Sequence, residues 1–178
     1  MRTPEDIETD ADGLIRLGTV ASVDLAGARC TVRIDEDAES PPLRWIEGRM
    51  GATRTWSPPS IGEQVLVLCP AGEIAAGLVL RGVVADAHPA PGTTLRELIR
   101  FADGAEIAYD PESHELEAVL PSGATAMLVA DGGITITGDI TLTGKLTASD
   151  DVIAGGISLK NHKHGGVQAG GAQTGAPE

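Results

Sequence analysis

The stretch that decides the fold reads Ile134-Thr-Ile-Thr-Gly-Asp139, Ile140-Thr-Leu-Thr-Gly-Lys145, Leu146-Thr-Ala-Ser-Asp-Asp151 and Val152-Ile-Ala-Gly-Gly-Ile157. Its period is six. Aliphatic residues occupy the first and third positions of each unit, threonine mostly fills the second, and glycine or aspartate stands at the fifth. Each unit therefore predicts a three-residue strand that carries two aliphatic side chains on one face and is followed by a bend.

A repeat unit of this kind cannot bury its apolar edge alone and must stack on neighbours. Four units in one chain would give a solenoid with a thin core and two open sheet edges. If three chains wind together, one unit from each completes a turn around a common axis. We therefore expect an intertwined, obligate homotrimer with a β-helical shaft. The alternative, a flexible tail with accidental periodicity, is disfavoured because disordered segments rarely carry regularly spaced Ile and Leu.

The repeat runs directly into Asn161-His-Lys-His-Gly-Gly166. In an extended segment, His162 and His164 point to the same side. One chain then offers two imidazoles, and three chains around an axis offer six. Six imidazoles suit octahedral Fe(II) or Ni(II) better than four-coordinate Zn(II). A short HxH motif alone is common in solvated tails, so the metal-site prediction for His162 and His164 depends on the repeat before it. The glycines that follow permit a tight fold-back at an apex.

Towards the N-terminus the pattern predicts a small closed barrel of OB type without a convincing helix. Its expected strands cover 14–23, 28–34, 43–46, 64–69 and 77–84. In the second of these, Cys30, Val32 and Ile34 face one side. Three more strands are expected at 98–102, 106–109 and 115–120, joined by turns. The fold class is therefore all-β, with an N-terminal arm (1–13), an OB-fold domain (14–90), a trimeric β-helix shaft (91–157) and a metal-bound apex (158–178).

Composition excludes several classes of function. Aromatic residues make up 2% of the 178 residues and glycine contributes 23, so the core must consist of small aliphatics. The formal net charge of −13 argues against binding to nucleic acid or anionic lipid. Cys30 and Cys69 are expected as small buried residues. The acidic start, where Thr3-Pro4 predicts a short helix, is the reverse of a signal peptide, and no apolar run approaches the ~20 residues of a membrane span.

The assembled pattern resembles baseplate assembly protein V, the central tail-spike family of contractile-tailed phages. The resemblance is carried by five segments that cover most of the chain in the family's order. They are Gly18-Thr-Val20, Trp45-Ile-Glu-Gly-Arg-Met-Gly51, the run from Trp56 to Leu68, Gly77-Leu-Val-Leu-Arg-Gly82, and the tail from His162 to Pro177.

The resemblance implies a non-enzymatic, mechanical spike that sheath contraction drives through the host's outer membrane. It implies an OB domain seated on tail hub and baseplate proteins, and one iron per trimer held on the threefold axis by His162 and His164. It also implies a place in the virion's tail baseplate after assembly in the host cytoplasm. Host, receptor and hub partner stay open, as does the choice between a phage and a tail-like bacteriocin.

Three other functions fit the sequence less well. Hexapeptide-repeat acyltransferases need many more coils per chain than the four present here. A spike-borne lysozyme needs two carboxylates positioned in a cleft, whereas the acidic residues are scattered through turns. A nucleic-acid-binding OB module could stack bases on Trp45 and Trp56, but the surrounding charge opposes it, and both are expected as core or trimer-contact anchors. His88 and His114 are expected on the surface.

Overall fold

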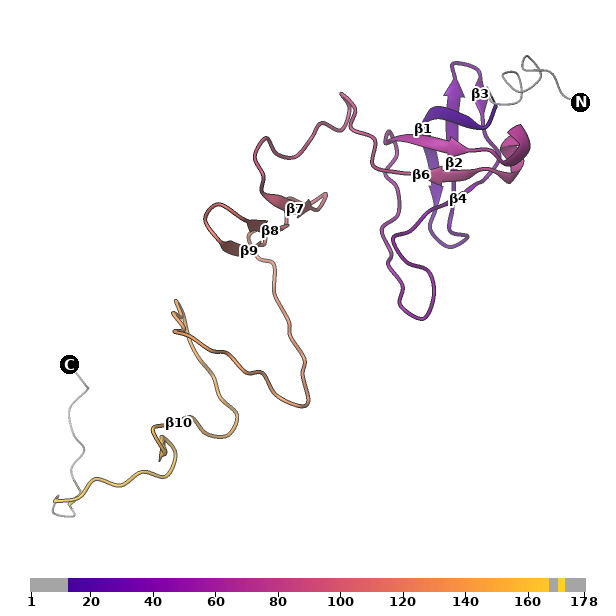
Figure 1. The fold of residues 1–178 in the computed structure, drawn as a ribbon. Coiled ribbons are helices and arrows are strands. Elements are labelled where there is room, and N and C mark those ends of the chain that lie inside the picture. The colour runs from indigo at the N-terminus through magenta and orange to yellow at the C-terminus, as the bar shows by residue number, and fades with distance from the viewer. Residues whose placement is uncertain (1–12, 167–169, 172–178) are drawn as a thin grey trace, which may run out of the picture. The chain divides into compact units, whose positions relative to one another are not determined.

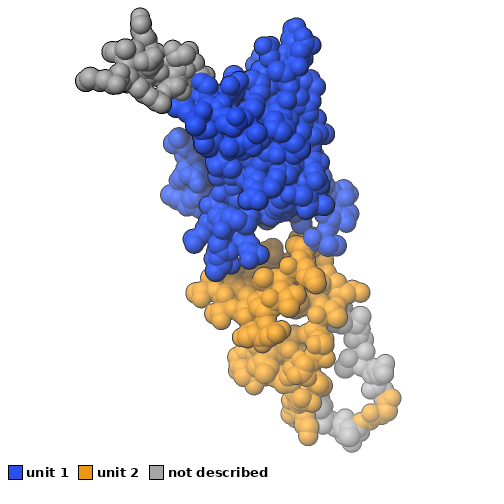
Figure 2. Space-filling view, turned by 90° about the vertical axis from the view of Figure 1, so that its right-hand side faces the viewer, with its two compact units in different colours: residues 1–125 blue, residues 126–178 orange. Residues whose placement is uncertain are grey.

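The computed structural model describes residues 13–166 and 170–171. The N-terminal arm up to residue 12 and the short helix expected there lie outside the described residues, as does part of the glycine-rich tail. The chain divides into two compact units, residues 1–125 and 126–178 (Figure 2).

Residues 15–80 form a small mixed barrel (Figure 1). Its strands are β1 (Ile15–Asp24), β2 (Arg29–Asp35), β3 (Ala38–Glu39), β4 (Arg44–Trp45), β5 (Gln64–Leu68) and β6 (Leu78–Leu80). β1 pairs antiparallel with β2 and β5, β5 pairs antiparallel with β6, and β6 pairs parallel with β4. The ring closes where the backbone N–H groups of Cys30 and Leu43 each donate to the other's carbonyl, at 2.9 and 2.8 Å. The expected small closed barrel is confirmed.

Buried and more exposed side chains alternate along β2, so that one face of the strand lines the barrel core. Cys30 and Val32 are buried, Ile34 is half-buried, and Arg33 between them is exposed, as expected for a strand with one buried face. Across from it, Gly18 of β1 allows a close approach, because a Cβ there would lie 2.5 Å from a methyl carbon of Val32. The two strands can therefore pack tightly where the barrel curves.

The barrel core contains small side chains, as the composition predicts. Its cluster consists of Val20, Cys30, Val32, Leu43, Trp45, Val65, Val67, Cys69 and Val79. Cys30 and Cys69 are free thiols with 1% and 2% exposure, so both are the small buried residues expected. Burial raises the pKa of the Cys30 thiol, the charge of Glu63 raises it further, and Arg81 partly opposes both. Cys30 therefore stays protonated and unreactive.

Glu47 anchors the loop that follows β4. Its carboxylate accepts hydrogen bonds from the indole N–H of Trp45 at 2.8 Å, the backbone N–H of Ser57 at 2.9 Å and the hydroxyl of Thr55 at 3.1 Å. Arg81 completes the network at 3.5 Å, and the Glu47 side chain is only 3% exposed. Burial would raise the pKa of Glu47, but these hydrogen bonds and Arg81 bring it below its usual value. Glu47 is thus an acidic residue held inside a hydrogen-bonded network and not on a solvated face.

Replacing Glu47 should therefore destabilise the barrel. Glu47→Ala leaves the N–H donors of Trp45 and Ser57 without their acceptor, which should lower the free energy of unfolding by about 1–3 kcal/mol. Because the folded pKa is depressed, the contribution of Glu47 is present above its unfolded value of about 4.3 and is lost as pH falls through the lowered value. Urea titration followed by Trp fluorescence measures both effects. Glu39→Ala, at an exposed residue of β3, is the matched control, and equal losses in both variants would contradict the network's role.

A second sheet consists of β7 (Glu97–Arg100), β8 (Glu106–Asp110) and β9 (Glu115–Val119), all antiparallel. These three strands are confirmed at their expected places. The registers Ile99↔Ile107 and Tyr109↔Leu116 put these four side chains on one face. They are 45–76% exposed, while the buried residues nearby are only Ala105 and Ala108. This meander therefore presents an apolar face that the described part of the chain does not cover.

The repeat region looks different from the barrel. Within the described chain, residues 126–152 contain no strand, and the first strands after them are β10 (Ile153–Ala154) and β11 (Ile157–Ser158). The first-position aliphatics Ile134, Ile140 and Leu146 are 59%, 70% and 70% exposed. The described helices are the three-residue 3₁₀ turns η1 (Pro70–Gly72) and η2 (Ile74–Ala76). No helix in the described ranges has the length and apolar content of a bilayer span.

Candidate metal centre at the C-terminal hairpin

A two-residue hairpin lies directly before the HxH motif. β10 and β11 pair through Ile153↔Ser158 and Ala154↔Ile157. The loop residues Gly155 and Gly156 both have positive φ, 57° and 84°, as a type I′ turn requires and as glycine readily adopts. The fourth hexad, interpreted as one more shaft unit, therefore folds back on itself in the single chain.

Asp151 forms hydrogen bonds with residues on both sides of this hairpin. Its Oδ1 accepts from the backbone N–H of Val152 at 2.9 Å and from that of Lys160 at 3.1 Å. The hydrogen bond from the Ser158 hydroxyl is the main reason why the pKa of Asp151 is lowered. Desolvation raises the pKa and so opposes this lowering, whereas the backbone N–H groups lower the pKa further. The Ser158 hydroxyl in turn accepts from the backbone N–H of Asn161 at 2.9 Å. The chain from 158 to 161 is thereby held in one turn.

The ring of His162 rests on this turn. Its Nδ1 lies 3.1 Å from the carbonyl oxygen of Ser158 and 3.2 Å from that of Leu159, and its backbone N–H donates to the same Ser158 carbonyl at 3.1 Å. Carbonyl oxygens can only accept, so Nδ1 carries the proton. The neutral ring then has its lone pair at Nε2, the arrangement usual for metal-ligating histidine.

His164 lies beside His162. The ring centroids are 5.0 Å apart and the planes meet at 78°, although neither residue is in a strand. Both side chains are exposed. Within the described residues, no group of three or more His, Cys, Asp or Glu side chains is close enough to hold a metal ion. Among the described residues, one chain therefore brings two imidazoles together here, those of His162 and His164.

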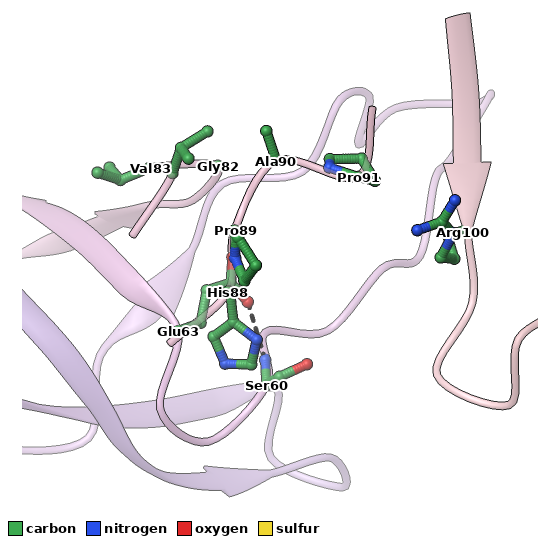
Figure 3. A pocket seen from close by; sticks show the side chains of 10 residues that line it. Ser60, Glu63, Gly82, Val83, His88, Pro89, Ala90, Pro91 and Arg100 are labelled. Atoms are coloured by element: carbon green, nitrogen blue, oxygen red, sulfur yellow. Dashed lines mark hydrogen bonds between the residues drawn. The ribbon is translucent and has the colours of Figure 1, made fainter. Parts of the chain in front are cut away.

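A cavity with a volume of about 430 Å³ lies in the N-terminal unit (Figure 3). Glu63 and His88 line it, and the carboxylate of Glu63 accepts from the backbone N–H of Ser60 at 2.9 Å. Among the described residues, the His88 ring makes no hydrogen bond to Ser60 or Glu63, so they do not form a nucleophile–base pair. His88 and His114 are exposed, as expected.

A smaller cavity of about 270 Å³ lies beside the two tryptophans. Trp45 is 9% exposed and belongs to the core, whereas Trp56 is 56% exposed; their ring centroids are 5.4 Å apart. The core role expected of Trp45 is confirmed, and Trp56 is a surface residue. Met50, 64% exposed, also lines this cavity. Met50 and Trp56, the latter packed against buried Trp45, form an apolar surface patch on the barrel, named the Trp56 patch below (Met50 and Trp56).

Comparison with known proteins finds two family models and one close relative. Residues 16–84 match the Type VI secretion system/phage-baseplate injector OB domain, and residues 156–178 match the GpV apex motif. The chain is 40% identical over 126 residues to the "Spike protein" of Escherichia phage P2. That alignment covers 70% of this chain and 58% of the relative, so it spans somewhat less than three fifths of the relative's length.

Proposed function

The chain belongs to the baseplate spike family of contractile-tailed phages, and from this we propose that it is a homotrimeric, non-enzymatic spike that pierces the host's outer membrane when the tail contracts. It acts as a structural part of the tail baseplate in the virion, assembled in the host cytoplasm. The work is mechanical. A stiff, narrow tip concentrates the force of contraction, and no bond in the target is cut.

The observation that carries the proposal is the run of exposed aliphatic side chains at regular spacing. Ile134, Ile140 and Leu146 are each at least 59% exposed, although full burial of such a side chain stabilises a protein by about 1.5–3 kcal/mol. A soluble protein rarely leaves so long an apolar run uncovered. Three copies wound as a β-helix over residues 91–157 would cover it, together with the apolar face of the β7–β9 sheet.

The two ends of the chain have separate roles in this proposal. The OB domain (14–90) seats the spike on tail hub proteins, and the Trp56 patch offers the apolar surface for that contact. The apex (158–178) carries the metal site, since the GpV apex motif is the metal-binding segment of such spikes. His162 and His164 from three chains would supply six imidazoles, a donor set that suits one iron per trimer. Bound there, the metal would cross-link three chain ends.

The experiment that tests this function measures mass and metal on one sample. Untagged protein, never exposed to chelator, is passed over a sizing column with light scattering, and its metal is counted by plasma mass spectrometry. We expect three times the 18.2 kDa chain mass and about one iron per three chains. A folded, monodisperse monomer would rule out the spike assembly. A trimer without stoichiometric metal would retain the shaft and remove the apex site.

A further inference from the structure

A neutral histidine binds a metal through the ring nitrogen that lacks the proton, and the hydrogen bond made by the other nitrogen decides which one that is. At His162 the Nδ1–H faces two carbonyl oxygens, those of Ser158 and Leu159. The Ser158 carbonyl belongs to the last residue of β11, whereas the Leu159 carbonyl lies in the turn that follows, outside the strand pairing. Something must therefore hold the turn in place, or the ring would be free to change its orientation and its tautomer.

The groups that hold the turn converge on one carboxylate. Asp151 accepts from the backbone N–H of Lys160 and from that of Val152, which brackets the hairpin from both ends. A second link joins the strands where the N–H of Leu159 donates to the carbonyl of Val152 at 3.0 Å. The Ser158 hydroxyl accepts from the N–H of Asn161. Apart from the bond from Val152 to Asp151, each of these contacts fixes a residue within four positions of His162.

We propose that Asp151 is the positioning residue of the apex. By holding the turn from Ser158 to Asn161 it keeps the proton of His162 on Nδ1 and leaves Nε2 as the metal-binding nitrogen. Asp151 does not touch the metal in this scheme; it acts through the backbone that the ring rests on. The inference rests on the proposed metal site and goes beyond it, because it assigns the ligand atom and the residue that selects it.

The neighbouring aspartate gives the matched control. Asp150 contacts the same Lys160, but only through its side chain, where Nζ lies 2.9 Å from Oδ1. That ion pair is 58% and 86% exposed at its two ends, and exposed pairs of this kind contribute little. Asp150 and Asp151 are adjacent, carry the same charge and differ in that only Asp151 binds the backbone of the turn.

The test compares full-length wild type with Asp151→Ala, Asp151→Asn and Asp150→Ala. Two readouts are taken: the rate at which iron passes to an excess of EDTA, and the ¹⁵N resonances of the His162 ring in metal-free protein. We expect Asp151→Ala to release iron about ten-fold faster or more, within the range typical of lost outer-shell partners. Asp150→Ala should match wild type, and Asp151→Asn should lie between, because its amide oxygen can still accept the two N–H bonds.

The ring resonances separate this inference from the metal site itself. Wild type should show the proton on Nδ1, and Asp151→Ala should show a mixture of tautomers. A proton on Nε2 in wild type overturns the inference, as does an Asp151→Ala protein that matches Asp150→Ala in both readouts. If wild type holds no iron, the proposed metal site fails and the tautomers alone decide the inference. If Asp151→Ala does not assemble, Asp151→Asn supplies the comparison.

Discussion

Ile140→Asp is expected to abolish the trimer. Ile140 stands at the first position of the second hexad and is 70% exposed in the single chain. In a three-chain shaft, three copies of this side chain meet near the axis. The substitution removes about 1.5–3 kcal/mol of burial per chain and sets three carboxylates close together in an apolar interior, which costs several kcal/mol more. Light scattering should then report a mass near that of one chain.

Thr141→Asp is the control for that substitution. Thr141 is the next residue along and faces away from the axis in the proposed shaft, so its carboxylate should stay in water and the trimer should persist. The barrel in both variants should keep the fluorescence of buried Trp45, because its core lies within residues 20–79. A trimeric Ile140→Asp protein, or equal disruption by Thr141→Asp, would contradict the inward placement of the first hexad position.

The barrel was predictable from the sequence because each of its strands can be recognised from its own residues. The alternation in β2 and the small aliphatic composition both point to the same closed sheet, and every strand partner lies within one chain. The six-residue repeat is plain in the sequence, yet residues 134–152 form no strand in the described chain. A strand needs hydrogen-bonding partners, and in the proposed trimer those partners lie on other chains. The periodicity of a sequence predicts which residues share a face, but it does not identify the chain that provides the hydrogen-bonding partners.

The two residues that sequence reasoning missed act through hydrogen bonds, Glu47 mainly with side chains and Asp151 with backbone N–H groups. Glu47 and Asp151 each look like one more acidic residue in an acidic chain, and no spacing rule marks them. The only available signal near Asp151 was Gly155-Gly156, a dipeptide typical of two-residue hairpin loops. That dipeptide predicts a hairpin in which residues 153–154 pair with 157–158, and such a hairpin places Asp151 near Lys160. For Glu47 the contacts with Ser57 and Arg81 are long-range, and only the fold brings them together.

Replacing both His162 and His164 with alanine should remove the metal while leaving the trimer intact. The metal count is expected to fall from about one per three chains to background, since all six proposed imidazoles are lost. The hexads lie before residue 158 and should still hold three chains together. The apex ends would then lack their cross-link, so the protein should unfold at a lower temperature than wild type. Plasma mass spectrometry and calorimetry on untagged protein measure the two effects.

The matched control for this loss is a His88→Ala/His114→Ala double variant. It also removes two exposed histidines from each chain, but neither lies near the HxH segment in sequence. It should keep its iron and its unfolding temperature. Equal metal loss in both double variants would mean that the iron is adsorbed at surface imidazoles in general. Retention of iron by His162→Ala/His164→Ala would place the site elsewhere in the chain. Selective loss, with the trimer preserved, assigns the iron to the pair whose rings lie 5.0 Å apart and makes the apex a cap on the shaft.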